Sequence, residues 1–188
     1  MGSHTLVLLR HAKAEPPTGG LPDAQRPLAD RGRADAIAAG SWLVANDLSP
    51  DLAFVSPALR ARQTWDGVRQ GMREAAPEAT VVDTAVTLVP ALYSEGVDAL
   101  IAMIGSMPEE ITTVLVIGHN PTISVVSAVL DPTGAYGTGL KTAGLAVHDV
   151  ATTWSRCGRG AMPVATLHTA RSITRSCRSS PERPSAEA

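Results

Sequence analysis

Three short apolar runs are each followed at once by residues suited to binding an anion, and this recurrence constrains the fold more than any other feature. Residues 6–9 lead into Arg10 and His11, a later run leads into His119, and a third leads into a helix start that carries Arg60. Buried parallel strands are continuous apolar runs, and open α/β sheets bind ligands beyond the carboxyl ends of their strands. We therefore expect these four side chains to meet at one edge of a sheet.

Extended and helical patterns alternate along the chain. We expect strands near residues 5–9, 52–55, 80–83, 112–117, 144–150 and 164–169, with residues 80–83 at an edge, and helices near residues 30–46, 57–74, 95–107 and 121–130. Strands that alternate with helices fold into layers around a mostly parallel sheet. The fold class is therefore α/β: a three-layer α/β/α sandwich whose central sheet ends in an antiparallel edge.

Polar side chains mark the predicted helix starts. Asp30, Ser56 and Ser94 stand where N-caps belong, and Pro57 fits the first turn of its helix. On the helix that contains Arg60, Arg62 lies about 200° further round and cannot share a pocket with it. The inward face expected for the first helix consists of Ala34, Ile37, Ser41 and Val44, with Leu43 at its edge.

The chain length and composition indicate one domain. Of 188 residues 44% are hydrophobic, which is enough for a full core, and we assign residues 1–169 to a single domain. Residues 170–188 are rich in Ser, Arg and Pro without periodicity, and we expect a disordered tail. Cys157 and Cys177 do not form a secreted disulfide framework, so we interpret them as free thiols.

Charge and hydropathy exclude several classes of partner. A net charge of −2 and 3% aromatic residues disfavour nucleic-acid binding. No apolar run reaches the ~18 residues of a membrane span, and the start of the chain lacks a signal-peptide pattern. We expect a cytoplasmic protein, without a membrane or nucleic-acid partner, that is a monomer or a weak dimer.

The candidate site residues suit a small oxyanion with more than one charge. Arg10 and Arg60 supply guanidinium groups that bind phosphate in a bidentate way and stay charged. His11 and His119 add imidazoles at neighbouring strand ends. No cluster of acidic residues suits magnesium and no histidine pair has zinc-ligand spacing, so we expect no metal or other cofactor.

The motifs around these residues resemble those of the histidine phosphatase superfamily, also called the phosphoglycerate mutase-like family. Residues 9–12 are similar to its Arg-His-Gly signature, with Ala12 in place of the glycine. Residues 56–64 look like the second motif, in which Arg60 matches the second phosphate arginine. Residues 118–121 look like the motif with the second histidine. The resemblance covers about residues 5–169 and implies a phosphoglycerate mutase-like fold.

One branch of the superfamily matches more closely. Residues 23–28, followed by Gly32, are similar to the SixA-type phosphohistidine phosphatases, and the short chain without an inserted lid domain fits that branch. The resemblance implies a metal-independent phosphatase that forms a covalent phosphohistidine intermediate. Its partner would be a protein that carries phosphohistidine or a small phosphorylated metabolite.

The resemblance also implies a role for each site residue. His11 would attack phosphorus while Arg10, Arg60 and His119 hold the phosphoryl group. The residue chemistry supports this division of roles, because nearby arginines keep His11 neutral and a protonated His119 would stabilise the transferring oxygens. Arg26 either contacts the phosphate or only braces its loop.

The identity of a proton donor stays open in the sequence. Asp23 either assists proton transfer or caps a turn beside Pro22. Mutase-like members carry a glutamate between the second and third motifs, but Glu74, Glu78 and Glu95 lie in no convincing motif. Imidazole leaves easily because its conjugate acid has a pKa of ~6.5, so a phosphoramidate substrate is favoured. The alternatives are a small-molecule phosphomonoesterase and a phosphate-binding module without turnover.

Overall fold

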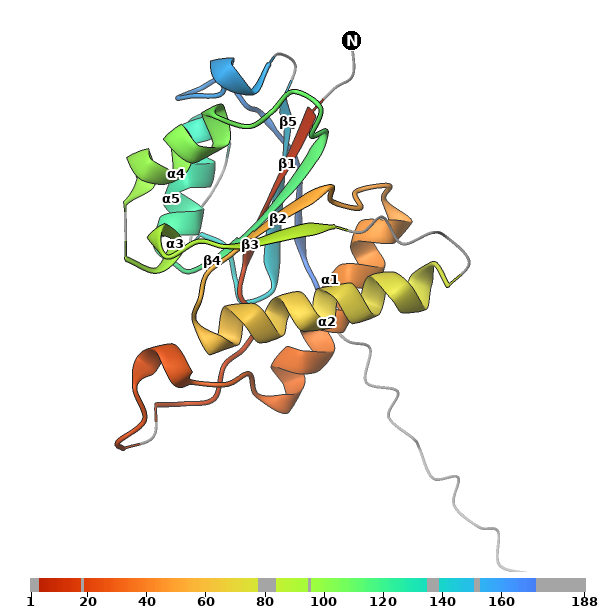
Figure 1. Cartoon of the computed structure of the whole chain (residues 1–188), viewed down its shortest axis with the longest axis vertical. Coiled ribbons are helices and arrows are strands. Elements are labelled where there is room, and N and C mark those ends of the chain that lie inside the picture. The colour runs from red at the N-terminus through yellow and green to blue at the C-terminus, as the bar shows by residue number, and fades with distance from the viewer. Residues whose placement is uncertain are drawn as a thin grey trace, which may run out of the picture.

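The computed structural model describes residues 4–17, 19–77, 84–94, 96–134, 139–150 and 153–171. Within these ranges six strands form one sheet in the order β3-β2-β4-β1-β5-β6 (Figure 1). The strands are β1 (His4–Arg10), β2 (Leu52–Val55), β3 (Ala85–Leu88), β4 (Thr113–Gly118), β5 (Gly144–Val150) and β6 (Val164–Thr169). The first four strands pair in parallel, and β5 and β6 pair antiparallel. The predicted mostly parallel sheet with an antiparallel edge is confirmed.

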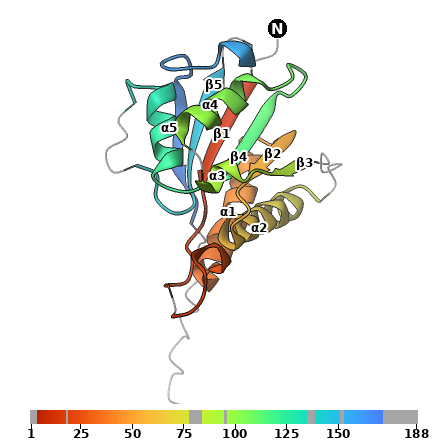
Figure 2. The same ribbon diagram turned by 60° about the vertical axis from the view of Figure 1, so that its left-hand side comes forward.

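Helices cover both faces of the sheet (Figure 2). One face packs against α1 (Asp30–Ala45) and α2 (Leu59–Ala75). The other packs against α4 (Val97–Gly105) and α5 (Thr122–Leu130), together with the short α3 (Ala91–Ser94) and the 3-10 turn η2 (Trp154–Arg156). A second 3-10 turn, η1 (Asp23–Gln25), lies in the long loop after β1. The α/β/α sandwich is therefore confirmed.

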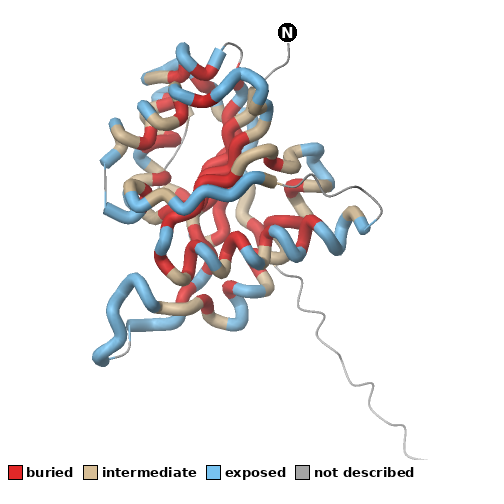
Figure 3. The backbone as a smooth tube through the Cα atoms, viewed as in Figure 1, coloured by how far each residue is buried: buried red, intermediate tan, exposed pale blue. Residues whose placement is uncertain are grey.

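Strand β1 is at the centre of both cores. Its side chains alternate between faces, so that Val7 and Leu9 pack towards α1 and α2 while Leu6 and Leu8 pack on the opposite side. All four are fully buried, and Figure 3 shows the central strands as the most buried part of the chain. No helix among the described residues is long and apolar enough to cross a membrane.

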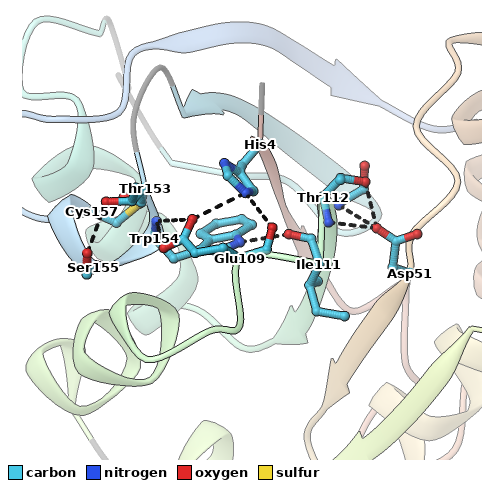
Figure 4. Close-up of polar contacts among 10 residues, drawn as sticks. His4, Asp51, Glu109, Ile111, Thr112, Thr153, Trp154, Ser155 and Cys157 are labelled. Atoms are coloured by element: carbon cyan, nitrogen blue, oxygen red, sulfur yellow. Dashed lines mark hydrogen bonds and ion pairs between the residues drawn. The ribbon is translucent and has the colours of Figure 1, made fainter. Parts of the chain in front are cut away.

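The amino-terminal side of β4 is held by polar contacts (Figure 4). One carboxylate oxygen of Asp51 accepts hydrogen bonds from the backbone of Thr112 at 2.8 Å and of Thr113 at 2.9 Å. The indole of Trp154 donates to the carbonyl of Ile111 at 2.8 Å. These contacts provide hydrogen-bond partners for backbone groups at one end of the sheet. Arg10 lies at the other end of the strands.

Two predicted elements differ from the structure. The predicted edge strand at residues 80–83 lies outside the described residues, and the edge strand of the sheet is β3, at residues 85–88. The helix predicted at residues 95–107 is present as the slightly shorter α4, and the short α3 precedes it as an element that the sequence did not predict. Ser94 ends α3, and its hydroxyl donates to the carbonyl of Pro90 at 3.3 Å instead of capping a helix.

The predicted N-caps of the first two long helices are also wrong. Helix α1 is preceded by Ala29, and no side chain caps it. Helix α2 begins at Leu59, two residues later than predicted, and Ser56 lies before it, where its hydroxyl accepts a hydrogen bond from the backbone N–H of Ala58 at 3.4 Å. The buried face of α1 consists of Gly32, Asp35, Ala36, Ala39, Gly40 and Leu43, so that of the predicted positions only Leu43 is fully buried.

The chain remains packed just beyond residue 169. Ala170 is 1% exposed, and its backbone N–H donates to the carbonyl of Ala143 at 3.0 Å. Arg171 donates to the carbonyl of Thr142 at 2.9 Å. The other residues of the predicted tail lie outside the described part of the chain.

Candidate active site

The structure brings Arg10, His11, Arg60 and His119 to one cleft of about 480 Å³. Strands β1 and β4 are parallel and in register, with Arg10 opposite Gly118, so the residues that follow each strand lie side by side. The ring centroids of the two histidines are 5.0 Å apart, and the rings are inclined at 53°. Arg60 reaches the same cleft from the first turn of α2.

Three hydrogen bonds fix the backbone and ring of His11. Its Nδ1 lies 2.8 Å from the carbonyl oxygen of Ala12, which can only accept, so Nδ1 carries the proton and Nε2 keeps the lone pair. The backbone N–H of His11 donates to Gly118 at 3.0 Å, and that of Ala12 donates to the hydroxyl of Thr64 at 3.0 Å. The imidazole is therefore held in the tautomer whose Nε2 is nucleophilic.

The pKa of His11 is lowered to about 4. Burial is the largest cause, and the charges of Arg60, Arg10 and Arg26 add to it, whereas the hydrogen bond to Ala12 opposes the shift. The ring is thus neutral at pH 7. The arginines act in the predicted direction, but burial contributes more than they do.

Arg60 is buried, with 6% of its surface exposed, and Asp23 holds it. Its Nη1 donates to the backbone carbonyl of Asp23 at 2.7 Å, and its Nη2 donates to the carboxylate of the same residue at 2.9 Å. Arg10 donates through Nη1 to the carbonyl of Leu140 at 2.9 Å. The Nε atoms of Arg10 and Arg60 are buried without a hydrogen-bond partner among the described residues, so neither guanidinium is fully satisfied by the protein itself.

His119 lies between a hydroxyl and an aromatic ring. Its Nε2 is 2.8 Å from the hydroxyl oxygen of Ser56, and the ring of Tyr93 meets it edge-on at 5.5 Å. Burial, followed by the neighbouring His11 and Arg60, lowers the pKa of His119 to about 3. Burial and the surrounding positive charges outweigh the attraction of Asp23, so the ring itself is neutral at pH 7.

The carboxylate of Asp23 forms ion pairs with two arginines. Besides Arg60, it contacts the hydroxyl of Tyr93 at 3.1 Å and the Nε of Arg26 at 3.2 Å. Desolvation acts to raise the pKa of Asp23, but the charge and hydrogen bond of Arg60 outweigh it, and the pKa lies below its usual value. Asp23 is ionised at pH 7 and does not cap the turn after Pro22. Arg26 lines the cleft and also braces this loop.

Sequence reasoning did not identify Ser56 and Tyr93 as site residues. Ser56 follows β2 directly, and this position was a usable signal, but the Ser-Pro pair suggested a helix cap. Tyr93 belongs to a segment without a motif, and only the tertiary fold brings it to the site.

The other candidates lie outside this site. Arg62 is exposed, as predicted. His148 is buried between the hydroxyl of Ser127 and the carbonyl of Met162, and His168 stacks on Trp42. The described residues contain no group of three side chains that could hold a metal ion.

Cys157 does not line the cleft. Cys157 is a free thiol, and burial raises its pKa to about 11, so it stays protonated. Cys177 lies outside the described residues.

Comparison with known proteins gives a consistent result. The family model for the histidine phosphatase superfamily (branch 1) matches residues 6–81. An uncharacterized protein of Mycobacterium tuberculosis is 32% identical over 171 residues, which cover 87% of this chain and 100% of that protein. A protein of Nakamurella multipartitia, assigned as phosphohistidine phosphatase SixA, superposes with a TM-score of 0.75 and 28% identity, covering 90% of this chain and 98% of its own.

A further structural likeness concerns the fold alone. The protein histidine phosphatase SixA in complex with tungstate superposes with a TM-score of 0.71 at 22% identity, covering 88% of this chain and 96% of its own.

Proposed function

Because this chain belongs to the histidine phosphatase superfamily, in its SixA-type branch, we propose that it removes the phosphoryl group from phosphohistidine in a protein. One observation carries the proposal. His11 is neutral, its Nδ1 proton is held by Ala12, and its ring lies in a cleft lined by Arg10, Arg60 and His119. A nucleophile with a free lone pair inside a cationic cleft is suited to phosphoryl transfer.

In the first step, Nε2 of His11 attacks phosphorus in line with the leaving nitrogen. A new N–P bond forms as the substrate N–P bond breaks, and the electron pair of the broken bond stays on the departing imidazole. The substrate ring enters with a proton on its other nitrogen and therefore leaves as neutral histidine. Arg10 and Arg60 hold the phosphoryl oxygens throughout the transfer.

In the second step, water attacks the phosphorus of phosphorylated His11. The N–P bond breaks and its electron pair returns to Nε2 of His11, which keeps the proton on Nδ1. Both protons of the water stay with the product, which leaves as dihydrogen phosphate. His119 has a lowered pKa before the anion binds, and a dianionic phosphoryl group beside it raises that pKa. His119 can then take up a proton and become the cation that the sequence predicted.

An ester substrate requires an acid to protonate its leaving group, and the candidate acids of this chain fit that role poorly. This is the main reason to favour a phosphoramidate. Asp23 is ionised and fixes Arg60, so a proton delivered through it requires its pKa to rise when the phosphoryl group binds. Glu74 is exposed near the far end of α2, where it accepts a hydrogen bond from Gln70. Glu78 and Glu95 lie outside the described residues. Imidazole leaves without such an acid, because its conjugate acid has a pKa of ~6.5.

The decisive experiment follows turnover and the covalent intermediate together. The purified protein is mixed with a phosphohistidine peptide, with phosphoramidate and with sugar phosphates, and reactions are quenched in alkali, in which phosphohistidine survives. We expect fast turnover of both N–P substrates, and we expect to find the protein phosphorylated at His11. His11→Asn should abolish both signals, and Arg60→Ala should slow turnover by about 10²–10³-fold.

Arg62→Ala is the matched control, because Arg62 lies on the same helix and is exposed. It should leave the rate unchanged, as should a metal chelator. Faster turnover of a sugar phosphate than of phosphohistidine would instead support the small-molecule phosphomonoesterase. Tight tungstate binding without any turnover would support a phosphate-binding module.

A further inference from the structure

A second hollow, of about 360 Å³, adjoins the catalytic cleft. Its lining consists of Arg10, Lys13, Arg31, Lys141, Thr142 and Arg171, and we name it the basic hollow. It shares Arg10, Lys13 and Thr142 with the cleft. One bound molecule can therefore occupy both at once.

The fold holds the cations of the basic hollow in place. Helix α1 approaches the segment after β1 so closely that a Cβ on Gly32 would lie 2.0 Å from the carbonyl oxygen of Lys13. The backbone N–H of Ala29 donates to the same carbonyl at 3.0 Å. This contact sets Lys13 beside the first turn of α1, which carries Arg31. Only glycine permits it, so the backbone at this border of the hollow is fixed.

Arg171 closes the other side of the hollow. Its Nη1 donates to the carbonyl of Thr142 at 2.9 Å and to that of Ala170 at 2.7 Å. The guanidinium is thus attached to the loop that precedes β5 and contributes to the lining from a defined position.

The basic hollow carries a large local excess of positive charge. Five of its six lining residues are cationic and none is acidic. The nearby carboxylate of Asp35 is buried and pairs with Arg31 at 3.7 Å and with Arg171 at 3.5 Å. Lys13, Lys141 and Arg10 add charges beyond this pairing, although the whole chain has a net charge of −2. Like charges gathered in a hollow attract an anion.

We propose that the basic hollow binds acidic side chains that flank the phosphohistidine on the protein substrate, an inference that rests on the proposed function. The exposure of the cations favours carboxylates on a protein surface over a second phosphate. The side chain of Arg31 is 70% exposed, and Lys141 is also exposed. The guanidinium groups of Arg31 and Arg171 already pair with the carboxylate of Asp35. Exposed point charges attract and orient an acidic surface, whereas capture of phosphate prefers free guanidinium groups.

The test compares two phosphohistidine peptides that differ only in their flanking residues, acidic in one and the corresponding amides in the other. At low salt, we expect the wild-type protein to show a kcat/KM about 10-fold higher for the acidic peptide, through a lower KM. The preference should largely disappear in about 0.5 M salt, because screening then acts within ~4 Å. The double variant Arg31→Ala/Lys141→Ala should lose the preference at low salt. Its kcat, and its turnover of phosphoramidate, should match those of the wild type.

A matched control removes the same amount of charge elsewhere. Arg69 and Arg159 are exposed and line neither hollow, so Arg69→Ala/Arg159→Ala should keep the peptide preference. Equal kcat/KM for the two peptides, with normal phosphoramidate turnover, would overturn this inference and leave the proposed function intact. Loss of turnover on every N–P substrate would overturn the proposed function itself. A preference for a small bisphosphate that is lost in Arg31→Ala/Lys141→Ala would assign the hollow to metabolites and overturn the protein partner.

Discussion

The hydroxyl of Ser56 provides a hydrogen-bond partner for the imidazole of His119. It is fully buried at the end of β2, and its oxygen lies 2.8 Å from Nε2 of His119. In Ser56→Ala, that nitrogen loses its partner in a buried place, which costs about 1–3 kcal/mol. We expect kcat to fall by roughly 5–150-fold, which is the rate equivalent of that energy. The Nε2 signal of His119 in an NMR spectrum should shift at the same time.

Ser41→Ala provides the control for this substitution. Among the described residues, the hydroxyl of Ser41 donates to two backbone carbonyls, those of Ile37 and Gly71, each at 3.3 Å, where α1 meets α2. The control should keep both the rate and the histidine signals of the wild type. An unchanged rate in Ser56→Ala would mean that His119 is held without the hydroxyl.

The candidate site residues differ in how far sequence reasoning could place them. Arg10, His11 and His119 follow apolar runs, so that strand pairing alone predicts their proximity. Tyr93 and Ser56 reach His119 from separate segments, and no local pattern encodes such contacts. The lowered pKa of His119 is likewise not encoded in any local pattern. Burial dominates its pKa, and burial is a property of the packed molecule.

At the scale of elements, the crossing of α1 and α2 depends on small residues. A Cβ on Gly40 would lie 1.9 Å from the carbonyl oxygen of Val68, and one on Gly71 would lie 1.9 Å from that of Ile37. The backbones thus touch without side chains between them. An apolar-periodicity argument gives weight to Ile37 and Val44, and glycine and alanine have little weight in it. For this reason the predicted inward face of α1 was wrong.

We expect Gly40→Ala to destabilise the protein. The methyl group meets backbone on the facing helix, which cannot yield as a flexible side chain would, so the helices must separate. Overpacking of this kind costs about 1–3 kcal/mol. Urea unfolding followed by circular dichroism should show a lower midpoint with an unchanged slope.

Gly105→Ala is the matched substitution in another helix. A Cβ there would approach no closer than 3.6 Å, to the carbonyl oxygen of Trp154, which is an ordinary contact. The same change should not destabilise the protein and should raise the free energy of unfolding by at most about 0.5 kcal/mol, because alanine favours helix over glycine but Gly105 is the last residue of α4. Equal effects at the two positions would contradict the close approach of α1 and α2.

The strands were easier to predict than the segments that connect them. Strands β1, β2 and β4 are continuous apolar runs because helices cover both of their faces. Strand β3 is exposed along its whole length, so burial imposes no such pattern on it. The short α3 was not predicted, because four residues are too few to show a helical periodicity.

At the scale of the whole molecule, the same features that keep the histidines neutral make the fold sensitive to acid. Burial is the main cause of the lowered pKa of His11, His119 and His148 in the folded protein. In the unfolded chain each ring has a pKa of ~6.5 and binds a proton as the pH falls below that value. The unfolded state then binds more protons than the folded state, so the free energy of unfolding must decrease.

The fall in stability should begin near pH 6.5 and continue for His11 until the pH reaches its folded pKa of about 4. Each fully shifted histidine contributes a loss of about 1.4 kcal/mol by about pH 5.5. A second loss should follow at lower pH from Asp131, whose hydrogen bonds, the largest from Thr133, lower its pKa to about 2. Urea unfolding at a series of pH values measures this dependence. His11→Asn should make the dependence between about pH 6.5 and pH 4 less steep, because asparagine does not titrate, and the contributions of His119 and His148 should remain. A free energy of unfolding that stays constant over this interval would show that the histidines titrate alike in the folded and unfolded chains, and the lowered pKa that keeps His11 neutral below pH 6.5 would be contradicted.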